Sequence, residues 1–130
     1  MNCGYKRITA PVLAVNIDIL TWQQALDQID AWSRRRLSRY VCITNAHSVV
    51  SANRDVAFSK VIRDADMATA DGAPVAWMLR RQGFVNQERI NGPDLMWRYC
   101  ARANDNGESI YLFGSAPATL SLLQDRLRTT

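Results

Sequence analysis

The chain has 130 residues, 48% of them apolar, which is enough for one domain with its own core. Its net charge of +4 comes almost entirely from arginine, with fourteen Arg against two Lys, and this favours a phosphorylated ligand, an anionic membrane face or nucleic acid. The composition excludes a disordered chain, and no stretch approaches the roughly 20 apolar residues that span a bilayer. Three cysteines without a Cys-x-x-Cys pair favour a reducing, cytoplasmic setting.

The first part of the chain predicts a strand and an amphipathic helix. Partial alternation of apolar residues indicates a strand over Pro11–Ile19. Thr21 then begins a helix with a capping box, since its side chain can accept from the backbone three residues on and Gln24 can reach back. Apolar residues recur every three or four positions along this helix at Trp22, Ala25, Leu26, Ile29 and Trp32. The helix ends at Arg34–Arg36, where positive charges are stabilised by the negative end of the helix dipole. Together with Arg39, these arginines are predicted to form a solvent-exposed helix end.

The middle of the chain predicts two short strands, each followed by a helix. The apolar run Tyr40–Thr44 indicates a strand buried on both faces. One helical segment follows, with apolar residues at helical spacing between Val49 and Ala65. Met67–Ala70 is a brief strand, and Pro74 suits the first turn of the next helix, Val75–Arg81.

The last part predicts a loop, a helix, a strand and a final helix. Gly83–Asn91 forms the loop, and Gly92–Pro93 opens a helix that closes near Asn106–Gly107. Ser109–Phe113 indicates a strand, after which Gly114–Ser115 turns into the final helix. That helix carries three leucines at helical spacing, Leu120, Leu123 and Leu127.

Strands that alternate with helices predict an α/β fold with a Rossmann-like, mostly parallel sheet and helices on both faces. Residues 1–130 are expected to form a single α/β domain. The chain ends on a helix, where a doubly wound sheet ordinarily crosses over to another strand, so we expect the sheet to be incomplete at the C-terminus. The sheet edge exposed in this way predicts either self-association, for example into a homo-oligomer, or poor solubility.

Polar clusters follow the apolar strands or precede helices at three places. They are Thr44–His47, Asp71–Pro74 and Glu88–Asp94. Strand ends in α/β proteins are held rigidly and open into a crevice, so these clusters are the expected place for chemistry.

These clusters, together with Ala65–Met67 and Tyr111–Pro117, resemble the WecG/TagA/CpsF family of bacterial glycosyltransferases. The resemblance covers the chain from about Val12 onward and extends through Val75 in the second cluster and Leu95 in the third. Each piece alone is weak, but the pieces in this order and spacing are specific.

The resemblance implies an inverting enzyme that moves a sugar from a UDP-sugar to a polyprenyl-diphosphate-linked sugar. The family works at the inner face of the cytoplasmic membrane and serves teichoic acid, common antigen and exopolysaccharide assembly. Its members are almost twice this length, and the remainder carries a basic appendage that contacts the membrane. The resemblance therefore implies the N-terminal portion of a cytoplasmic, peripheral enzyme that needs neither a metal nor another cofactor.

Asp71 is the residue that the resemblance implies as the catalytic base. Inverting transfer needs a group that takes the proton from the acceptor hydroxyl as its oxygen attacks the anomeric carbon. Asp71 follows a strand and precedes a glycine, which predicts a side chain that projects into the crevice. The alternative from local sequence is that Asp71 caps the next helix.

Further residues are implied as substrate-binding. Thr44 and Asn45 would line the pocket beside the base, and their alternative is an N-cap pair for the helix near His47. Arg89 would oppose the diphosphate charge, and its alternative is a surface salt bridge with Glu88. The remaining substrate-binding predictions are His47, Gly72, Gly92, Asp94 and Gly114. For Gly114 the alternative is a plain turn.

No metal site is expected. Asp64–Asp66 has the Asp-x-Asp pattern of metal-dependent glycosyltransferases, but it closes a helix and is interpreted as structural. His47, the only histidine, has no second imidazole or cysteine nearby for a zinc site.

Two other function classes compete with the transferase. The first is a catalytically inactive nucleotide-sugar-binding fragment of the same fold, for which UDP binding without turnover is the discriminating result. The second is a nucleic-acid-binding module, suggested only by the basic charge. The arginines are spread along the chain and no RRM-like aromatic platform is present in the sequence, so no nucleic-acid partner is expected.

Overall fold

The structure, a computed structural model, describes residues 6–129, and these form six helices and four strands. The α/β class predicted from the sequence is confirmed. The chain divides after Leu95 into two compact units. No helix within residues 6–129 combines the length and the apolar character that crossing a membrane requires.

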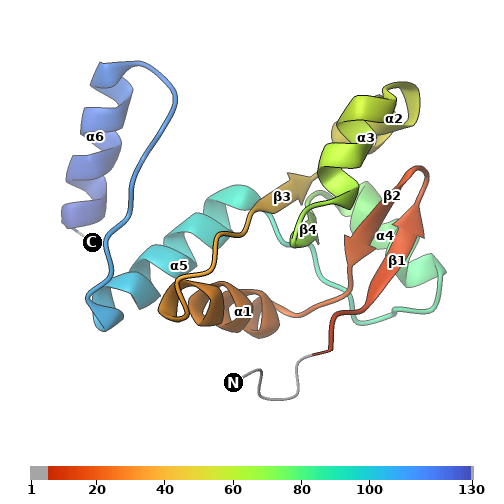
Figure 1. Cartoon of the computed structure of the whole chain (residues 1–130), viewed down its shortest axis with the longest axis horizontal. Coiled ribbons are helices and arrows are strands. Elements are labelled where there is room, and N and C mark those ends of the chain that lie inside the picture. Colours follow the sequence, from red (N-terminus) through yellow and green to blue (C-terminus); the bar gives the residue numbers. More distant parts are fainter. Residues whose placement is uncertain (1–5, 130) are drawn as a thin grey trace. The chain divides into compact units, whose positions relative to one another are not determined.

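The first unit opens with an antiparallel hairpin of β1 (Thr9–Val12) and β2 (Val15–Asp18), in which Val12 faces Val15 (Figure 1). The prediction of one strand over residues 11–19 was therefore wrong. The chain reverses at Leu13, whose φ is +53°. Leucine rarely adopts this left-handed conformation, so the turn carries no Gly, Asn or Asp signal that sequence reasoning could use.

Helix α1 (Trp22–Arg34) begins as predicted. The Oγ1 of Thr21 accepts from the backbone N–H of Gln24 at 3.1 Å, and the Gln24 side chain accepts from the Thr21 N–H at 2.9 Å. This capping box satisfies two N–H groups that the helix itself leaves unpaired. The predicted arginine end is confirmed for Arg34–Arg36, which are exposed, with Arg35 as the C-cap and Arg34 ion-paired to the buried Asp30. Arg39 lies beyond the helix and is ion-paired to Asp66.

The parallel sheet of the first unit consists of β3 (Val41–Thr44) and β4 (Met67–Ala70). In its register Val41 lies opposite Met67 at one end and Thr44 lies opposite Ala70 at the other. All of β4 is buried. Burial of β3 on both faces was predicted wrongly, because its first three residues are only half-buried and Thr44 alone is buried. Within the described residues, β3 is an edge strand with β4 as its one partner.

Two helices connect these strands, α2 (Ala46–Arg54) and α3 (Val56–Arg63), where the sequence predicted one helical segment. Asp55 separates them. Its extended backbone, with φ −129° and ψ 108°, interrupts the helix, and its Oδ1 accepts from the N–H of Phe58 at 3.1 Å. Asp55 therefore ends one helix and caps the next, which favours two short helices over one.

Helix α4 (Ala73–Arg81) follows β4 and carries Pro74 in its first turn, as predicted. The loop that comes next returns to the sheet, where the Ile90 N–H donates to the Ala70 carbonyl at 2.9 Å. Figure 1 shows α4 beside the β1–β2 hairpin, and the Gln82 side chain ties the two by donating to the Pro11 carbonyl at 2.8 Å.

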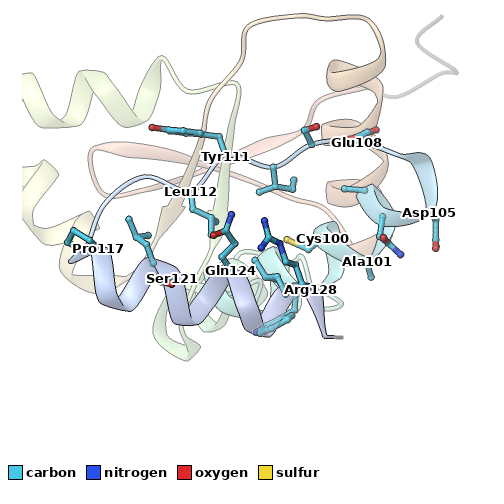
Figure 2. Close-up of a pocket in the computed structure, with 17 residues that line it drawn as sticks. Cys100, Ala101, Asp105, Glu108, Tyr111, Leu112, Pro117, Ser121, Gln124 and Arg128 are labelled. Carbon is cyan, nitrogen blue, oxygen red and sulfur yellow. The ribbon is translucent and has the colours of Figure 1, made fainter.

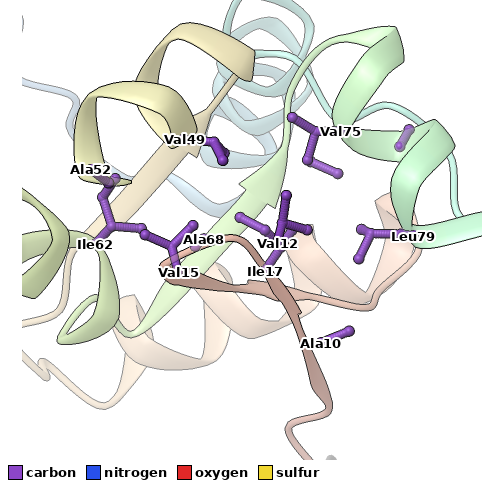
Figure 3. Packing of buried hydrophobic residues seen from close by; sticks show 12 residues of the cluster. Ala10, Val12, Val15, Ile17, Val49, Ala52, Ile62, Ala68, Val75 and Leu79 are labelled. Carbon is purple, nitrogen blue, oxygen red and sulfur yellow. The ribbon is translucent and has the colours of Figure 1, made fainter. Parts of the chain in front are cut away.

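The core of the first unit lies between the hairpin, β4 and helices α2 to α4 (Figure 3). The cluster comprises Ala10, Val12, Val15, Ile17, Val49, Ala52, Ile62, Ala68, Ala70, Val75, Ala76 and Leu79. Side chains such as Ile17 and Leu79 are fully buried, and each contributes on the order of 1.5–3 kcal/mol through its removal from water. This core fixes the hairpin against β4 and so supports the carboxyl end of the sheet.

Helix α5 (Gly92–Asn106) begins in the first unit and continues in the second, which also contains α6 (Pro117–Arg128). The strand predicted over residues 109–113 is not formed. No strand among residues 6–129 pairs with this segment, and Tyr111 and Phe113 are 87% and 92% exposed. A strand depends on a neighbour for its backbone hydrogen bonds, so its apolar sequence alone does not produce one.

Candidate functional site

Asp71 lies where the two parallel strands end. Its backbone N–H donates to the Thr44 carbonyl at 3.0 Å and to the Thr69 carbonyl at 3.1 Å, so the carboxyl ends of β3 and β4 are joined at this residue. The side chain is 21% exposed. The N-cap of α4 is Gly72, which has no side-chain capping bond. The capping role considered for Asp71 is therefore wrong, and its carboxylate is available for other contacts.

Arg89 faces Asp71, with its Nε 3.7 Å from the Asp71 Oδ1. The guanidinium side chain is 57% exposed. This ion pair replaces the Glu88 partner considered from the sequence. It brings a cation and a carboxylate from separate segments to the same end of the sheet.

Asn45 caps α2, as the capping interpretation proposed. Its Oδ1 accepts from the N–H of Ser48 at 2.9 Å and from the Ser48 hydroxyl at 3.0 Å. Thr44 is buried, and its hydroxyl donates to the Cys42 carbonyl at 3.2 Å. His47 is exposed in the first turn of α2. Ligand contact by these three residues stays a prediction, and for Thr44 the burial favours a role in holding the strand end.

Two glycines stand at this end of the sheet. Gly72 has φ +95°, and a Cβ built on it would lie 4.0 Å from the Asn45 Cβ, so the two residues are neighbours. Gly92 begins α5, and a Cβ there would lie 3.6 Å from the Ile43 side chain. Asp94 is exposed in the first turn of α5. The structure thus gathers the predicted residues of the first unit around the ends of β3 and β4.

The second unit contains Gly114 and a large cavity. Gly114 has φ +112° in the turn before α6, and its contact with a nucleotide stays a prediction. The cavity, of about 1230 Å³, is lined by α5, the segment Glu108–Leu112 and α6. Figure 2 shows Cys100, Tyr111 and Gln124 among its lining residues. Helix α6 has no buried residue, and no predicted site residue lines this cavity.

The Asp-x-Asp pair has structural partners. Asp64 is ion-paired to Lys60 one helical turn earlier. Asp66 accepts from the Tyr40 N–H at 3.0 Å and lies 3.4 Å from the Arg39 Nε. These contacts support the structural interpretation of both carboxylates. The described part of the chain holds no cluster of three His, Cys, Asp or Glu side chains suited to a metal ion.

Three groups near the sheet or in α5 have shifted pKa values. Burial raises the pKa of the Cys42 thiol, which lies in β3 two residues before Thr44, and that of the Cys100 thiol in α5. The pKa of Tyr40 is raised first by desolvation and then by nearby negative groups, Asp66 among them. All three groups therefore resist deprotonation.

Sequence reasoning missed two buried polar residues that support the site. The Asp18 carboxylate accepts from Arg7 at 2.8 and 3.0 Å and from the Ala68 N–H at 2.7 Å, which fastens β2 to β4. An acidic residue inside an apolar strand was a usable signal for it. Gln87 is 5% exposed and bonds to the backbone of Leu20. A single glutamine in a loop gives no comparable signal.

Comparison with known protein families gives a match over most of the chain. The family model described as "Glycosyl transferase WecG/TagA/CpsF family" matches residues 10–130. The match includes both parallel strands, the Asp71 turn and the loop that carries Arg89. The chain therefore belongs to the WecG/TagA/CpsF family of glycosyltransferases.

Proposed function

We propose that this chain is an inverting glycosyltransferase that moves a hexose, an N-acetylhexosamine or its uronate from a UDP-sugar to a polyprenyl-diphosphate-linked sugar. The product would enter cell-surface polysaccharide or teichoic acid synthesis. The observation that carries the proposal is the pairing of Asp71 with Arg89 at the carboxyl end of the parallel strands, in a chain of a glycosyltransferase family. The reaction requires a base for the acceptor hydroxyl and a cation for the leaving diphosphate, and this end of the sheet supplies both residue types.

In the proposed mechanism Asp71 acts as the general base. Its carboxylate takes the proton of the acceptor hydroxyl while that oxygen forms a bond to the anomeric carbon of the donor. The bond from this carbon to the diphosphate oxygen breaks, and its electron pair leaves with UDP. The two backbone bonds of Asp71 support this role, because they fix the backbone that carries the carboxylate at the strand end before substrate arrives.

Arg89 would stabilise the negative charge that grows on the leaving diphosphate. A separation of 3.7 Å is too long for a strong hydrogen bond to Asp71, so the guanidinium keeps its donors for phosphate oxygens. The N-terminus of α4 lies directly after Asp71 and Gly72 and has no side-chain cap. Its N–H groups add positive potential on the same side of the sheet.

The acceptor is anchored in lipid, so the enzyme would work in the cytoplasm, peripherally at the inner face of the membrane. The excess of arginine supports this location, because basic side chains are attracted to anionic headgroups. The exposed apolar side chains of Tyr111 and Phe113 favour a further apolar contact, such as one within a homo-oligomer.

Calorimetry with UDP, without and with Mg²⁺, tests the nucleotide site. We expect metal-independent binding that Arg89→Ala weakens by about tenfold to a hundredfold, since it removes charged hydrogen bonds. Asp71→Asn should largely keep the affinity. Arg54→Ala is the matched control, because it removes the same charge at the far end of α2. Absence of UDP binding by the folded wild type would overturn the proposed donor site.

Turnover separates the transferase from an inactive binding domain. UDP release from UDP-sugars with a short-chain polyprenyl-diphosphate-linked acceptor should be lost in Asp71→Asn and retained in Arg54→Ala. UDP binding without release from any donor would instead support a nucleotide-sugar-binding function. Equal activity of Asp71→Asn and the wild type would remove Asp71 from the mechanism.

A further inference from the structure

The buried carboxamide of Gln87 holds the loop that carries Arg89. Its Oε1 accepts from the Leu20 N–H at 3.0 Å, and its Nε2 donates to the Leu20 carbonyl at 3.0 Å. The same Nε2 donates to the Glu88 carbonyl at 2.8 Å. The Gln87 side chain therefore accepts one hydrogen bond from the Leu20 backbone and donates one to it, as a neighbouring strand would. Leu20 is the residue just before the capping box of α1.

Two further bonds fix the loop backbone around Arg89. The Arg80 guanidinium of α4 donates to the Gln87 carbonyl at 2.9 Å. The Ile90 N–H donates to the Ala70 carbonyl, which directly precedes Asp71. Arg89 is thus held between an anchor two residues before it and an anchor one residue after it, while its own side chain is more than half exposed.

We propose that Gln87 is a positioning residue for glycosyl transfer, which keeps the Arg89 backbone in place so that the guanidinium stays opposite Asp71. This inference rests on the proposed function and extends it to a residue that touches neither substrate nor reacting atoms. A carboxamide is required because the Leu20 backbone presents one donor and one acceptor together. A glutamate would turn an acceptor toward the carbonyls of Leu20 and Glu88, and a hydrocarbon would leave these buried groups unpaired.

The chain offers a matched control. Gln82 also donates its Nε2 to a backbone carbonyl, that of Pro11 at 2.8 Å, but this bond joins the end of α4 to β1. Gln87→Met and Gln82→Met remove the same chemical group at the same side-chain length. Gln82 is exposed, so Gln82→Met reports the effect of losing one side-chain bond to the backbone, whereas displacement of Arg89 would follow from Gln87→Met alone.

Amide hydrogen exchange on the full chain tests the anchor. We expect Gln87→Met to lower the protection of the Ile90 amide by about tenfold, since the loop loses bonds of ordinary strength. The Ala68 amide, which donates to Asp18, serves as the internal reference and should keep its protection. Unchanged protection of Ile90, or an equal loss at Ala68, would overturn the anchoring role.

UDP affinity, measured by calorimetry, tests whether the anchor acts through Arg89. Gln87→Met should weaken UDP binding by about tenfold in the wild type and have little further effect in an Arg89→Gln background, because the two changes remove one interaction. Gln82→Met should leave affinity unchanged. Additive losses in the double variant would overturn the coupling. If the wild type binds no UDP, the proposed function fails, and the positioning of Arg89 for transfer fails with it. The hydrogen-exchange result then still shows whether Gln87 holds the loop.

Discussion

Asp71 and Arg89 meet across the carboxyl end of β4, with 3.7 Å between the Arg89 Nε and the Asp71 Oδ1. The backbone of Asp71 is bonded to the strand ends, and the guanidinium comes from a loop whose backbone is held through Gln87 and Ile90. A partly exposed pair at this distance contributes little to stability. A phosphate ligand can therefore replace Asp71 as the ion-pair partner of Arg89 with little loss of free energy. The Asp71 carboxylate is then free to accept a proton.

Asp71→Asn should separate activity from stability. We expect the free energy of unfolding to change by less than about 1 kcal/mol, because the ion pair is partly exposed. Transfer should fall by about 10²–10⁴-fold, since the general base is lost. Urea unfolding and UDP release measure the two effects. Asp55→Asn is the control, because asparagine caps α3 equally well, and an equal loss of transfer in that variant would contradict the prediction.

Thr69→Val should leave stability unchanged or raise it by up to about 1–2 kcal/mol. The Thr69 hydroxyl is buried and has no hydrogen-bond partner among the described residues. Its burial therefore costs desolvation free energy that no hydrogen bond offsets, and replacing it by a methyl group removes that cost. Thr44→Val makes the same change on the paired strand, where the hydroxyl donates to the Cys42 carbonyl, and should lose about 0.5–1.5 kcal/mol. Chemical denaturation of both variants checks the opposite signs, and a clear loss in Thr69→Val would count against the prediction.

Asp18→Asn should lose about 3 kcal/mol or more of unfolding free energy. The carboxylate accepts from Arg7 and from the Ala68 N–H in a buried position, and an amide group would turn a donor toward one of these donors. Asp66→Asn is the comparison, because Asp66 is partly exposed and should lose about 1 kcal/mol or less. Thermal and urea unfolding provide the measurement. Equal losses of unfolding free energy in the two variants would show that the buried Asp18 carboxylate is not the main interaction that holds β2 against β4.

Much of the helical structure follows from local chemistry. The capping box of Thr21 and Gln24 and the position of Pro74 each set a helix start that the sequence predicted. The carboxyl ends of parallel strands meet by geometry, so Asp71 lies at the strand end as expected. The helix starts depend on residues close together in the chain, and the strand end follows from a general rule of parallel sheets, which is why pattern reasoning reached them.

The features that sequence reasoning missed depend on distant partners. The bonds of Gln87 to Leu20 span 67 residues, and that of Asp18 to Ala68 spans 50. The segment around Tyr111 has the composition of a strand, but no neighbouring strand in the described residues supplies its backbone partners. Local sequence encodes the preference for extended structure and not the presence of a partner.

Leu13→Gly should stabilise the chain by about 1 kcal/mol. Leucine at φ +53° is strained by its Cβ, and glycine adopts this conformation without that cost. Ala14→Gly changes the next residue of the same turn, which is not left-handed, and should lose about 0.5–1 kcal/mol through added freedom of the unfolded chain. Melting temperatures of both variants give the comparison. Destabilisation by Leu13→Gly would mean that the leucine side chain contributes more than its strain costs.

The Cys42 thiol should react slowly with iodoacetamide. The thiolate is the nucleophile, and burial raises the thiol pKa, so less thiolate is present at pH 8 than in an ordinary cysteine. The folded state also holds this proton more tightly than the unfolded state, so the associated stability is present below pH 9.0 and is lost as pH rises through the raised pKa. Alkylation rates from pH 8 to 10 in a Cys3→Ser, Cys100→Ser background check this, and reaction as fast as free cysteine at pH 8 would refute it.

Gly72 limits how this site can change. Its surroundings leave room for a methyl group, since the nearest atoms to an added Cβ lie 3.8 and 4.0 Å away, but its φ of +95° disfavours every side chain. A library of substitutions at this position would therefore rank variants by backbone strain and not by the space around the residue. Any replacement would rotate the peptide that joins Asp71 to α4, so directed evolution toward new donors would have to alter neighbours such as Asn45 and leave this glycine in place.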